Sequence, residues 1–240
     1  MTTHTVSHHP VRSDLPQPGA DALAGAPASS TRWALAGVGA GVLGLAAIIT
    51  SLQVDAIYDP KVKGDTVGQA DKLADQIPQI AAFHTCAGLS AVLLIVFAAG
   101  LHRRLRAAAA ESIAPVVAFA GMFGTAIIVV MGTGLDTEFM FGLAEEGLAD
   151  PANAVMFGHW IATIPWVWGL TGLAGVAIFS VARGGGAPRW IGLVGLLLGG
   201  LTLLAGLSPA QYMAGFTGPV LVLVLAVGFL LGDKVHRGRA

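Results

Sequence analysis

Six long apolar stretches follow one another along the chain, each separated from the next by a shorter polar segment. An α-helix rises about 1.5 Å per residue, so about 20 apolar residues cross the roughly 30 Å hydrocarbon core of a bilayer. The six stretches are Trp33–Gln53, Gln79–Leu101, Ile113–Leu135, Ala154–Val181, Trp190–Leu207 and Tyr212–Leu231. This pattern predicts an all-α, polytopic transmembrane helical bundle with six spans, formed by residues 33–232.

Polar tails flank the predicted membrane domain. Residues 1–32 are rich in Pro, Ser, Thr, Ala and Gly and hold almost no large apolar side chains, so they cannot bury enough surface to offset the entropy of ordering them. We expect a disordered N-terminal tail there and a short basic tail at residues 233–240. Because six crossings are an even number, both tails lie on the same side of the membrane.

The basic residues predict which side that is. Every arginine falls in the tails or in the segments that join the spans on the side of the tails, and the opposite loops carry only Lys61, Lys63 and Lys72 as basic residues. The positive-inside rule then places both termini in the cytoplasm of a multi-pass protein of the plasma (inner) membrane. Most of the acidic residues lie in the opposite, outer loops.

Composition supports the membrane class. The chain is 55% hydrophobic and 11% charged, whereas about a quarter of the residues in a soluble domain are charged. The apolar runs are continuous rather than alternating, which argues against a transmembrane β-barrel. Cys86 is the single cysteine, so an intrachain disulfide and a redox pair of thiols are both excluded.

Small residues and the two outer loops give further structural expectations. The spacing of Gly37 with Gly41, and of Gly195 with Gly199, is typical of helices that pack closely within a membrane. In the first outer loop, Asp71–Gln76 is expected to form a short surface helix. In the second, an apolar cluster of Phe139, Met140 and Phe141 is expected to cap the bundle or to lie on the membrane interface.

Four ionisable residues are expected at one depth near the outer surface. His84 and His159 each lie near the outer end of a span, and Asp136 and Glu138 end the third span. Ionisable groups within a bilayer are costly, so each is a candidate for ligand or cofactor binding. The alternative is structural, with the two histidines donating hydrogen bonds to the acids or to backbone carbonyls. His102 lies five helical turns after His84 on the same face, about 27 Å away and therefore at the other leaflet.

Two cofactors fit this set of residues. Neutral imidazoles from different helices are the usual axial ligands of a b-type haem, so His84 and His159 are candidate metal ligands. Histidine with nearby methionine also suits copper. The sequence has no CxxCH, HExxH or CxxC motif that would specify either one.

The fourth span contains Pro165 between Trp160 and the pair Trp166 and Trp168. Proline removes a backbone hydrogen bond and kinks a helix, and a kink within a membrane is tolerated where it lines a cavity. Trp166 and Trp168 are therefore either part of an aromatic belt at the interface or the wall of a pocket in which a flat ligand stacks.

Three functions remain open on the sequence. The leading hypothesis is a non-catalytic binding or partner-support protein with a polar site near its outer face. The alternatives are a haem- or metal-binding electron-transfer subunit, and a small transporter or intramembrane cavity enzyme. The expected partners are membrane lipid and other membrane proteins; the short basic clusters do not indicate nucleic-acid binding.

Overall fold

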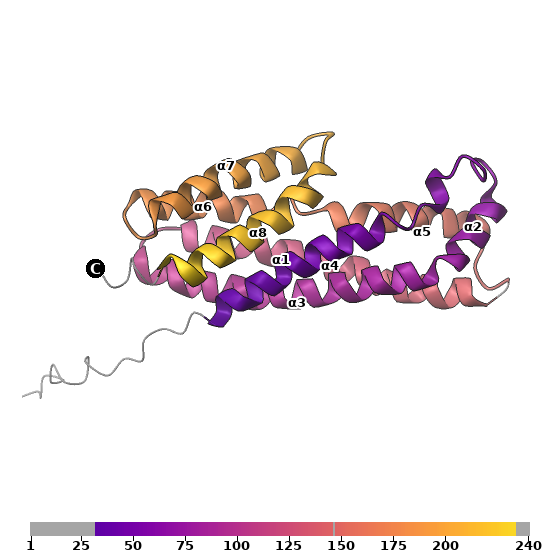
Figure 1. Ribbon diagram of the computed structural model, residues 1–240, viewed down its shortest axis with the longest axis horizontal. Helices are drawn as coiled ribbons and strands as arrows, with labels where there is room; N and C mark the ends of the chain where they lie inside the picture. The colour runs from indigo at the N-terminus through magenta and orange to yellow at the C-terminus, as the bar shows by residue number, and fades with distance from the viewer. Residues whose placement is uncertain (1–31, 146, 234–240) are drawn as a thin grey trace, which may run out of the picture. The chain divides into compact units, whose positions relative to one another are not determined.

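The computed structural model describes residues 32–145 and 147–233, so the two predicted tails lie almost wholly outside the described residues. The described chain is helical, without a strand (Figure 1). Its elements are α1 (Arg32–Ser51), η2 (Ala56–Tyr58), α2 (Thr66–Asp75), α3 (Ile77–Ala108), α4 (Ala114–Ala144), α5 (Pro151–Thr163), η3 (Ile164–Trp166), α6 (Thr171–Arg183), α7 (Arg189–Gly206) and α8 (Met213–Leu231). Both η elements are short 3-10 helices.

Five of these helices, α1, α3, α4, α7 and α8, are long and apolar enough to cross a membrane. A sixth, α6, is also apolar but has only 13 residues. The prediction of an all-α transmembrane bundle is therefore confirmed, with five long candidate spans and one shorter apolar helix in place of six full spans.

The predicted fourth span is wrong as a continuous helix. The segment 154–181 is divided between α5 and α6 by η3 and a turn. Pro165 has no backbone N–H with which to continue the helical ladder, and beyond it Trp168 donates its N–H to the Trp166 carbonyl at 2.9 Å. The N–H of Thr171 then bonds to the Trp168 carbonyl at 3.0 Å, which starts the next helix.

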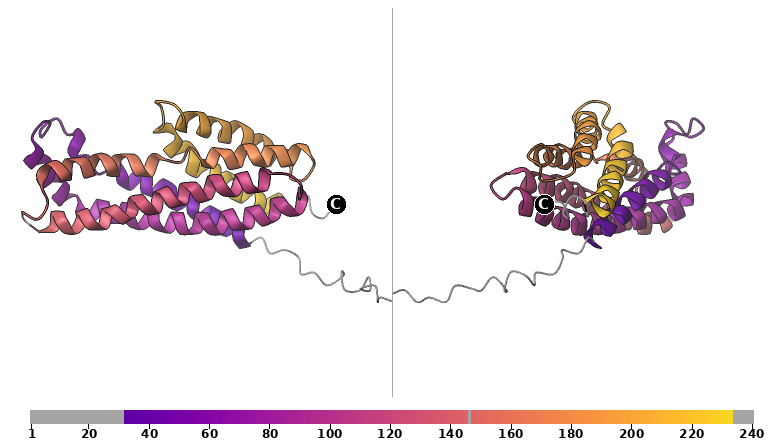
Figure 2. Two further views of the ribbon diagram at one scale, coloured as in Figure 1. Left: turned by 180° about the vertical axis from the view of Figure 1, so that it is seen from behind. Right: turned by 60° about the vertical axis from the view of Figure 1, so that its left-hand side comes forward.

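The helices form two layers, with α6, α7 and α8 packed on one side of α1, α3 and α4 (Figures 1 and 2). Two histidines show the antiparallel register of α3 and α4. His84 Nδ1 lies 3.0 Å from the Thr133 carbonyl oxygen, and His102 Nδ1 lies 3.0 Å from that of Pro115. The two contacts are 18 residues apart on both helices, so the predicted common face of His84 and His102 is the face that α4 covers.

Glycines allow the close helix crossings that the sequence predicts. A Cβ on Gly195 would lie 2.6 Å from the carbonyl oxygen of Gly175, and one on Gly199 would lie 2.9 Å from that of Gly172. A Cβ on Gly41 would lie 2.9 Å from the Pro219 carbonyl oxygen. Any larger side chain at these positions would separate α6 from α7 or α1 from α8, so the predicted packing role of Gly41, Gly195 and Gly199 is confirmed.

A cap stands at one end of the bundle, beyond the hairpin between α7 and α8 (Figure 1). We define the cap as η2, α2, α5 and the adjoining ends of α3 and α4. Its core holds the buried side chains of Ile57, Leu73 and Phe157. The predicted cluster of Phe139, Met140 and Phe141 lies in α4 rather than in a loop. Phe139 stacks on Phe157 with ring centroids 4.1 Å apart and so contributes to the cap, whereas Phe141 is exposed.

The first helix of the cap begins earlier than the sequence predicts. Expected at Asp71–Gln76, it starts at Thr66, because the Asp65 side chain accepts a hydrogen bond from the Gly68 N–H at 3.1 Å. A side-chain oxygen in this position satisfies a backbone donor that the first turn of a helix leaves unpaired.

We call the opposite end, where α1 begins and α8 ends, the terminal end. The described arginines all lie at helix ends on this side, on α1, α3, α6 and α7: Arg32, Arg103, Arg104, Arg106, Arg183 and Arg189. Arg104 donates to both carboxylate oxygens of Asp233, at 2.8 and 2.7 Å, and so joins α3 to the end of α8.

Candidate functional site

The seam between α3 and α4 brings together two of the four predicted ionisable residues. His84 lies on α3, and its Nδ1 is 3.0 Å from the Thr133 carbonyl oxygen and 3.8 Å from Oδ2 of Asp136. A carbonyl oxygen only accepts hydrogen bonds, so Nδ1 carries the proton and donates to Thr133. The His84 side chain is about one third exposed.

The carboxyl group of Asp136 is buried without a hydrogen bond from any described residue. Its side chain is 1% exposed, and neither oxygen has a hydrogen-bond partner among the described residues. Burying an ionised carboxylate away from a donor is strongly unfavourable, and buried polar groups in proteins are nearly always hydrogen-bonded. The distance of 3.8 Å from the imidazole is too long for a hydrogen bond.

The other two ionisable residues lie elsewhere in the cap. His159 is exposed on α5, where its ring packs edge-on against Tyr58 with centroids 6.4 Å apart. Glu138 is exposed and lines a surface cleft with Asp150 and Asn153. The structure therefore joins His84 to Asp136 and places His159 and Glu138 in other surroundings.

The haem and copper hypotheses gain no support from these positions. Within residues 32–145 and 147–233, no group of three or more His, Cys, Asp or Glu side chains is placed to hold a metal ion. The ring of His84 contacts α4, and that of His159 contacts the loop after α1. Ligation of one haem by these two histidines stays a prediction.

The two tryptophans after Pro165 have different surroundings. Trp168 is 3% exposed and packs where a Cβ on Gly44 or Gly218 would meet its ring, so it fills a close crossing between α1 and α8. Trp166 is 8% exposed and lines an open groove at the cap side of the same crossing. Trp166 therefore lies in the wall of a groove, as the second of the two alternatives expects, and stacking of a flat ligand there stays a prediction. Trp168 fits neither the belt nor the pocket wall, because it packs within the bundle.

The groove beside Trp166 has a volume of about 390 Å³ and lies between the end of α1, η2, η3 and the start of α8. The rings of Tyr212 and Phe216 stand nearly perpendicular to that of Trp166, at 75° and 76° with centroids 6.0 and 4.8 Å away. We call this the aromatic groove, and its lining residues are Ser51, Leu52, Val54, Asp55, Tyr58, Trp166, Tyr212, Met213 and Phe216.

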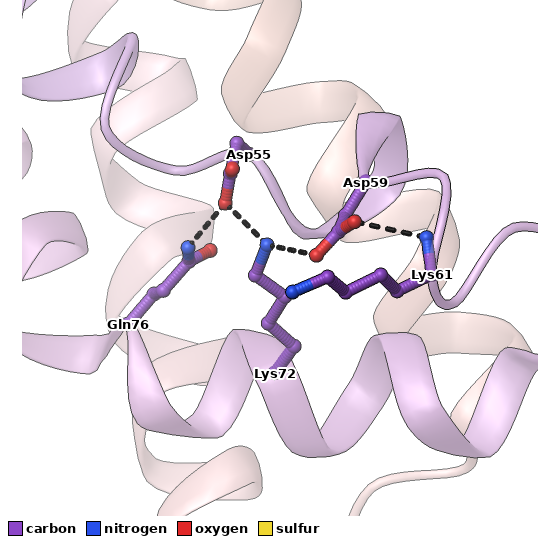
Figure 3. A network of polar contacts seen from close by, with 5 residues as sticks. All are labelled: Asp55, Asp59, Lys61, Lys72 and Gln76. Carbon is purple, nitrogen blue, oxygen red and sulfur yellow. Dashed lines mark hydrogen bonds and ion pairs between the residues drawn. The ribbon is translucent and has the colours of Figure 1, made fainter.

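A network of polar contacts surrounds Lys72 (Figure 3), and one of its members, Asp55, also lines the aromatic groove. The ammonium of Lys72 on α2 lies 2.8 Å from Asp55 Oδ1 and 2.7 Å from Asp59 Oδ2, and the amide of Gln76 donates to Asp55 Oδ1 at 2.6 Å. The hydrogen bonds from Lys72 and then from Gln76 hold the pKa of Asp55 below its ordinary value. Burial, and next the proximity of Tyr212, raise the pKa of Tyr58.

The break between α5 and α6 connects the seam to the groove. A Cβ on Gly132 would overlap the Ile164 side chain, so Ile164 packs directly on α4 one helical turn before Asp136. Trp166, two residues later in the same η3 element, lines the groove. A single three-residue segment thus contacts α4 one turn from Asp136 and also lines the aromatic groove.

Sequence reasoning missed Asp55, Tyr58 and Tyr212. Tyr58 and Tyr212 are separated by 154 positions, and only the folded arrangement of α1 and α8 brings them to one groove. The signal that was available was their location: both tyrosines adjoin the predicted outer ends of spans, where amphipathic aromatic residues gather.

Comparison with known protein families, with curated proteins and with solved structures returned no match for this chain.

Proposed function

We propose that this membrane protein is a non-catalytic binding protein that takes up a small amphiphilic molecule in the aromatic groove. We further propose that it resides in the plasma membrane, with the cap outside the cell and both termini in the cytoplasm. The positions of the basic residues support this orientation. The described arginines gather at the terminal end, whereas lysine is the only one of the two basic residue types, Arg and Lys, in the described segments at the cap end.

The groove itself is the observation that carries the proposal. Its volume of about 390 Å³ lies within the roughly 300–1,000 Å³ range of small-molecule sites, which are lined mainly by apolar and aromatic groups with a few polar ones. Leu52, Met213 and Phe216 come from the ends of two candidate spans, whereas Asp55 and Tyr58 come from the cap. Such a gradient from apolar to polar matches an amphiphile.

The polar groups of the groove favour binding over catalysis. The Ser51 hydroxyl points to the Ile161 carbonyl oxygen at 3.4 Å, and no histidine lines the groove that would activate it. Asp55 has a lowered pKa, so its carboxylate is a weak base at neutral pH.

Tryptophan quenching in nanodiscs tests the proposal. A dibrominated dodecanol quenches nearby indoles, and we expect a saturable component of quenching in the wild-type protein. This component should disappear in Trp166→Phe, which keeps an aromatic wall but removes the reporter. Trp190 is the matched control, because it is 49% exposed and lies on α7 near the terminal end; Trp190→Phe should leave the saturable component intact.

Two phenylalanines then test whether the groove itself binds. Phe216→Ala removes a wall of the groove and should weaken the apparent affinity about tenfold, since packing against an aromatic ring contributes on the order of 1 kcal/mol and more with the buried area. Phe123 is similarly exposed but stacks on Phe119, away from the groove. Phe123→Ala should therefore not change the affinity. Purely linear quenching, as expected for partitioning into lipid, would contradict the proposed function.

A further inference from the structure

The geometry points to a ligand with a cationic, ammonium-type head group and an alkyl tail, its head held between Asp55 and the aromatic rings of the groove. This inference rests on the proposed function and specifies the class of molecule bound. It concerns Asp55, Tyr58, Tyr212 and Trp166, which the polar seam at His84 and Asp136 does not include.

The first observation is a carboxylate oxygen that remains available. Both side-chain donors to Asp55 converge on Oδ1, from Lys72 at 2.8 Å and from Gln76 at 2.6 Å, and no other side chain of the described residues donates to Oδ2 (Figure 3). The Asp55 side chain is 56% exposed. Oδ2 can therefore accept a bond from, or pair with, a group that enters the groove.

The other carboxylate that binds Lys72, that of Asp59, has no such available oxygen. Its Oδ2 accepts from Lys72 at 2.7 Å and its Oδ1 from the Lys61 backbone N–H at 2.9 Å, so both oxygens are occupied. Asp59 also does not line the groove. Two carboxylates share the ammonium of Lys72, and the additional positive charge of Lys61 acts on Asp59. Of the two acids, Asp55 is the one that lines the groove.

The second observation is the arrangement of the rings. Trp166 stands nearly perpendicular to both Tyr212 and Phe216, so the groove presents aromatic walls in more than one direction. The face of an aromatic ring attracts a cation within about 6 Å, and walls of this kind around a quaternary ammonium are a recurring mode of recognition. An anionic head would meet both the carboxylate and the ring faces unfavourably.

The alkyl tail of the proposed ligand fits the apolar part of the groove. Leu52, Val54 and Met213 line it alongside Phe216, and these residues adjoin the ends of α1 and α8, two helices that are apolar enough to span a membrane. An alkyl chain placed here continues the apolar surface of the bundle while the head remains at the cap.

Competition against the brominated alcohol tests the head group. Octyltrimethylammonium, octyl sulfate and octanol share one tail, and each is added to the wild-type protein in phosphatidylcholine nanodiscs carrying the brominated probe. We expect the ammonium compound to displace the probe at a concentration about tenfold lower than octyl sulfate, with octanol between them. This ranking needs no variant, so it is independent of any folding defect.

A matched pair of variants then assigns the preference to Asp55. Asp55→Asn should remove most of the ammonium advantage over octanol, whereas Asp59→Asn, which disturbs the same lysine, should preserve it. Equal or better displacement by octyl sulfate, or an equal loss in both variants, would overturn the inference. Saturable quenching without head-group preference would refute the inference alone, while absence of saturable quenching would refute the proposed function and the inference with it.

Discussion

A buried aspartate lies at each end of the bundle, and the two have opposite surroundings. Asp233, at the terminal end, is 0% exposed and is gripped by the Arg104 guanidinium through Nε at 2.8 Å and an Nη at 2.7 Å. The same guanidinium donates to the Gly186 carbonyl oxygen at 3.1 Å. Asp136, near the cap, is also buried, but neither of its oxygens has a hydrogen-bond partner among the described residues.

At the terminal end a buried ion pair joins several elements, whereas at the cap end the buried acid joins none by a hydrogen bond among the described residues. A bidentate guanidinium–carboxylate pair is strong and directional, and here it ties α3 to α8 and to the loop between α6 and α7. At the cap the α3–α4 seam leaves the buried acid Asp136 without a hydrogen bond from the described residues, and α5 is separated from α6 by a break in the helix. The aromatic groove and the α3–α4 seam both lie at the cap end, where a buried polar group lacks a hydrogen bond from the described residues.

The largest effect is expected from Arg104→Ala. It leaves Asp233 buried without its guanidinium, and breaking a buried ion pair by removing one partner costs about 3–5 kcal/mol. Equilibrium unfolding in mixed detergent micelles measures the loss. The exposed neighbour Arg103 is the control, and Arg103→Ala should change stability by less than about 0.5 kcal/mol. A small loss of unfolding free energy for Arg104→Ala would show that the Arg104–Asp233 ion pair does not stabilise the terminal end.

Isosteric replacement of the two aspartates sharpens the comparison. Asp233→Asn removes the charge that Arg104 faces and should cost at least about 2 kcal/mol, since hydrogen bonds to charged groups contribute roughly 1.5–3 kcal/mol. Asp136→Asn removes no hydrogen bond and relieves a carboxyl that has no donor, so stability should stay within about 0.5 kcal/mol or rise. The same unfolding measurement applies to both variants. Equal losses would mean that Asp136 has a partner as strong as Arg104.

The two histidines of α3 allow a test by double-mutant cycle. Each donates Nδ1–H to a carbonyl of α4 at 3.0 Å, so His84→Ala and His102→Ala should each cost about 1 kcal/mol. Only His84 lies beside Asp136. We expect a coupling free energy of about 0.5 kcal/mol or more between His84→Ala and Asp136→Asn. The effects of His102→Ala and Asp136→Asn should be additive, because His102 lies about 27 Å from His84 along α3. If His102→Ala also coupled to Asp136→Asn, the coupling at His84 would not be due to its position beside Asp136.

Much of this fold is predictable because membrane physics leaves few alternatives. Continuous apolar runs must form helices that satisfy their own backbone, and arginines gather on one side. The broken fourth span is the instructive failure: the sequence showed that Pro165 disturbs a helix, but not that α5 would leave the bundle to join the cap. That outcome depends on the cap core around Leu73 and Phe157, which forms from segments far apart in the chain.

The site was predictable only in part. Depth along a helix follows from residue number, so His84 and Asp136 could be placed at one level. The direction in which each side chain points around its helix decides contact, and His159 and Glu138 are turned to other surroundings. The groove required Tyr58 and Tyr212 to meet across the ends of α1 and α8, which no local pattern specifies.

The smallest effect is expected from the partly exposed ion pairs of the cap, the counterpart of the buried pair at the terminal end. Hydrogen bonds from Lys72 lower the pKa of Asp55 and of Asp59, and these carboxylates raise the pKa of Lys72. Because the folded-state pKa of each acid lies below its ordinary value of 3.8, the stabilisation is present above that value and is lost as pH falls through the lower, folded-state pKa.

Lys72→Met should therefore lower the melting temperature slightly at neutral pH. The difference in melting temperature from wild type should vanish at strongly acidic pH. It should also shrink with added salt, which screens exposed charges. Arg104→Ala should remain destabilised in the same salt series, because the Arg104–Asp233 pair is buried. A large, salt-independent loss for Lys72→Met would show that the cap is fastened as firmly as the terminal end.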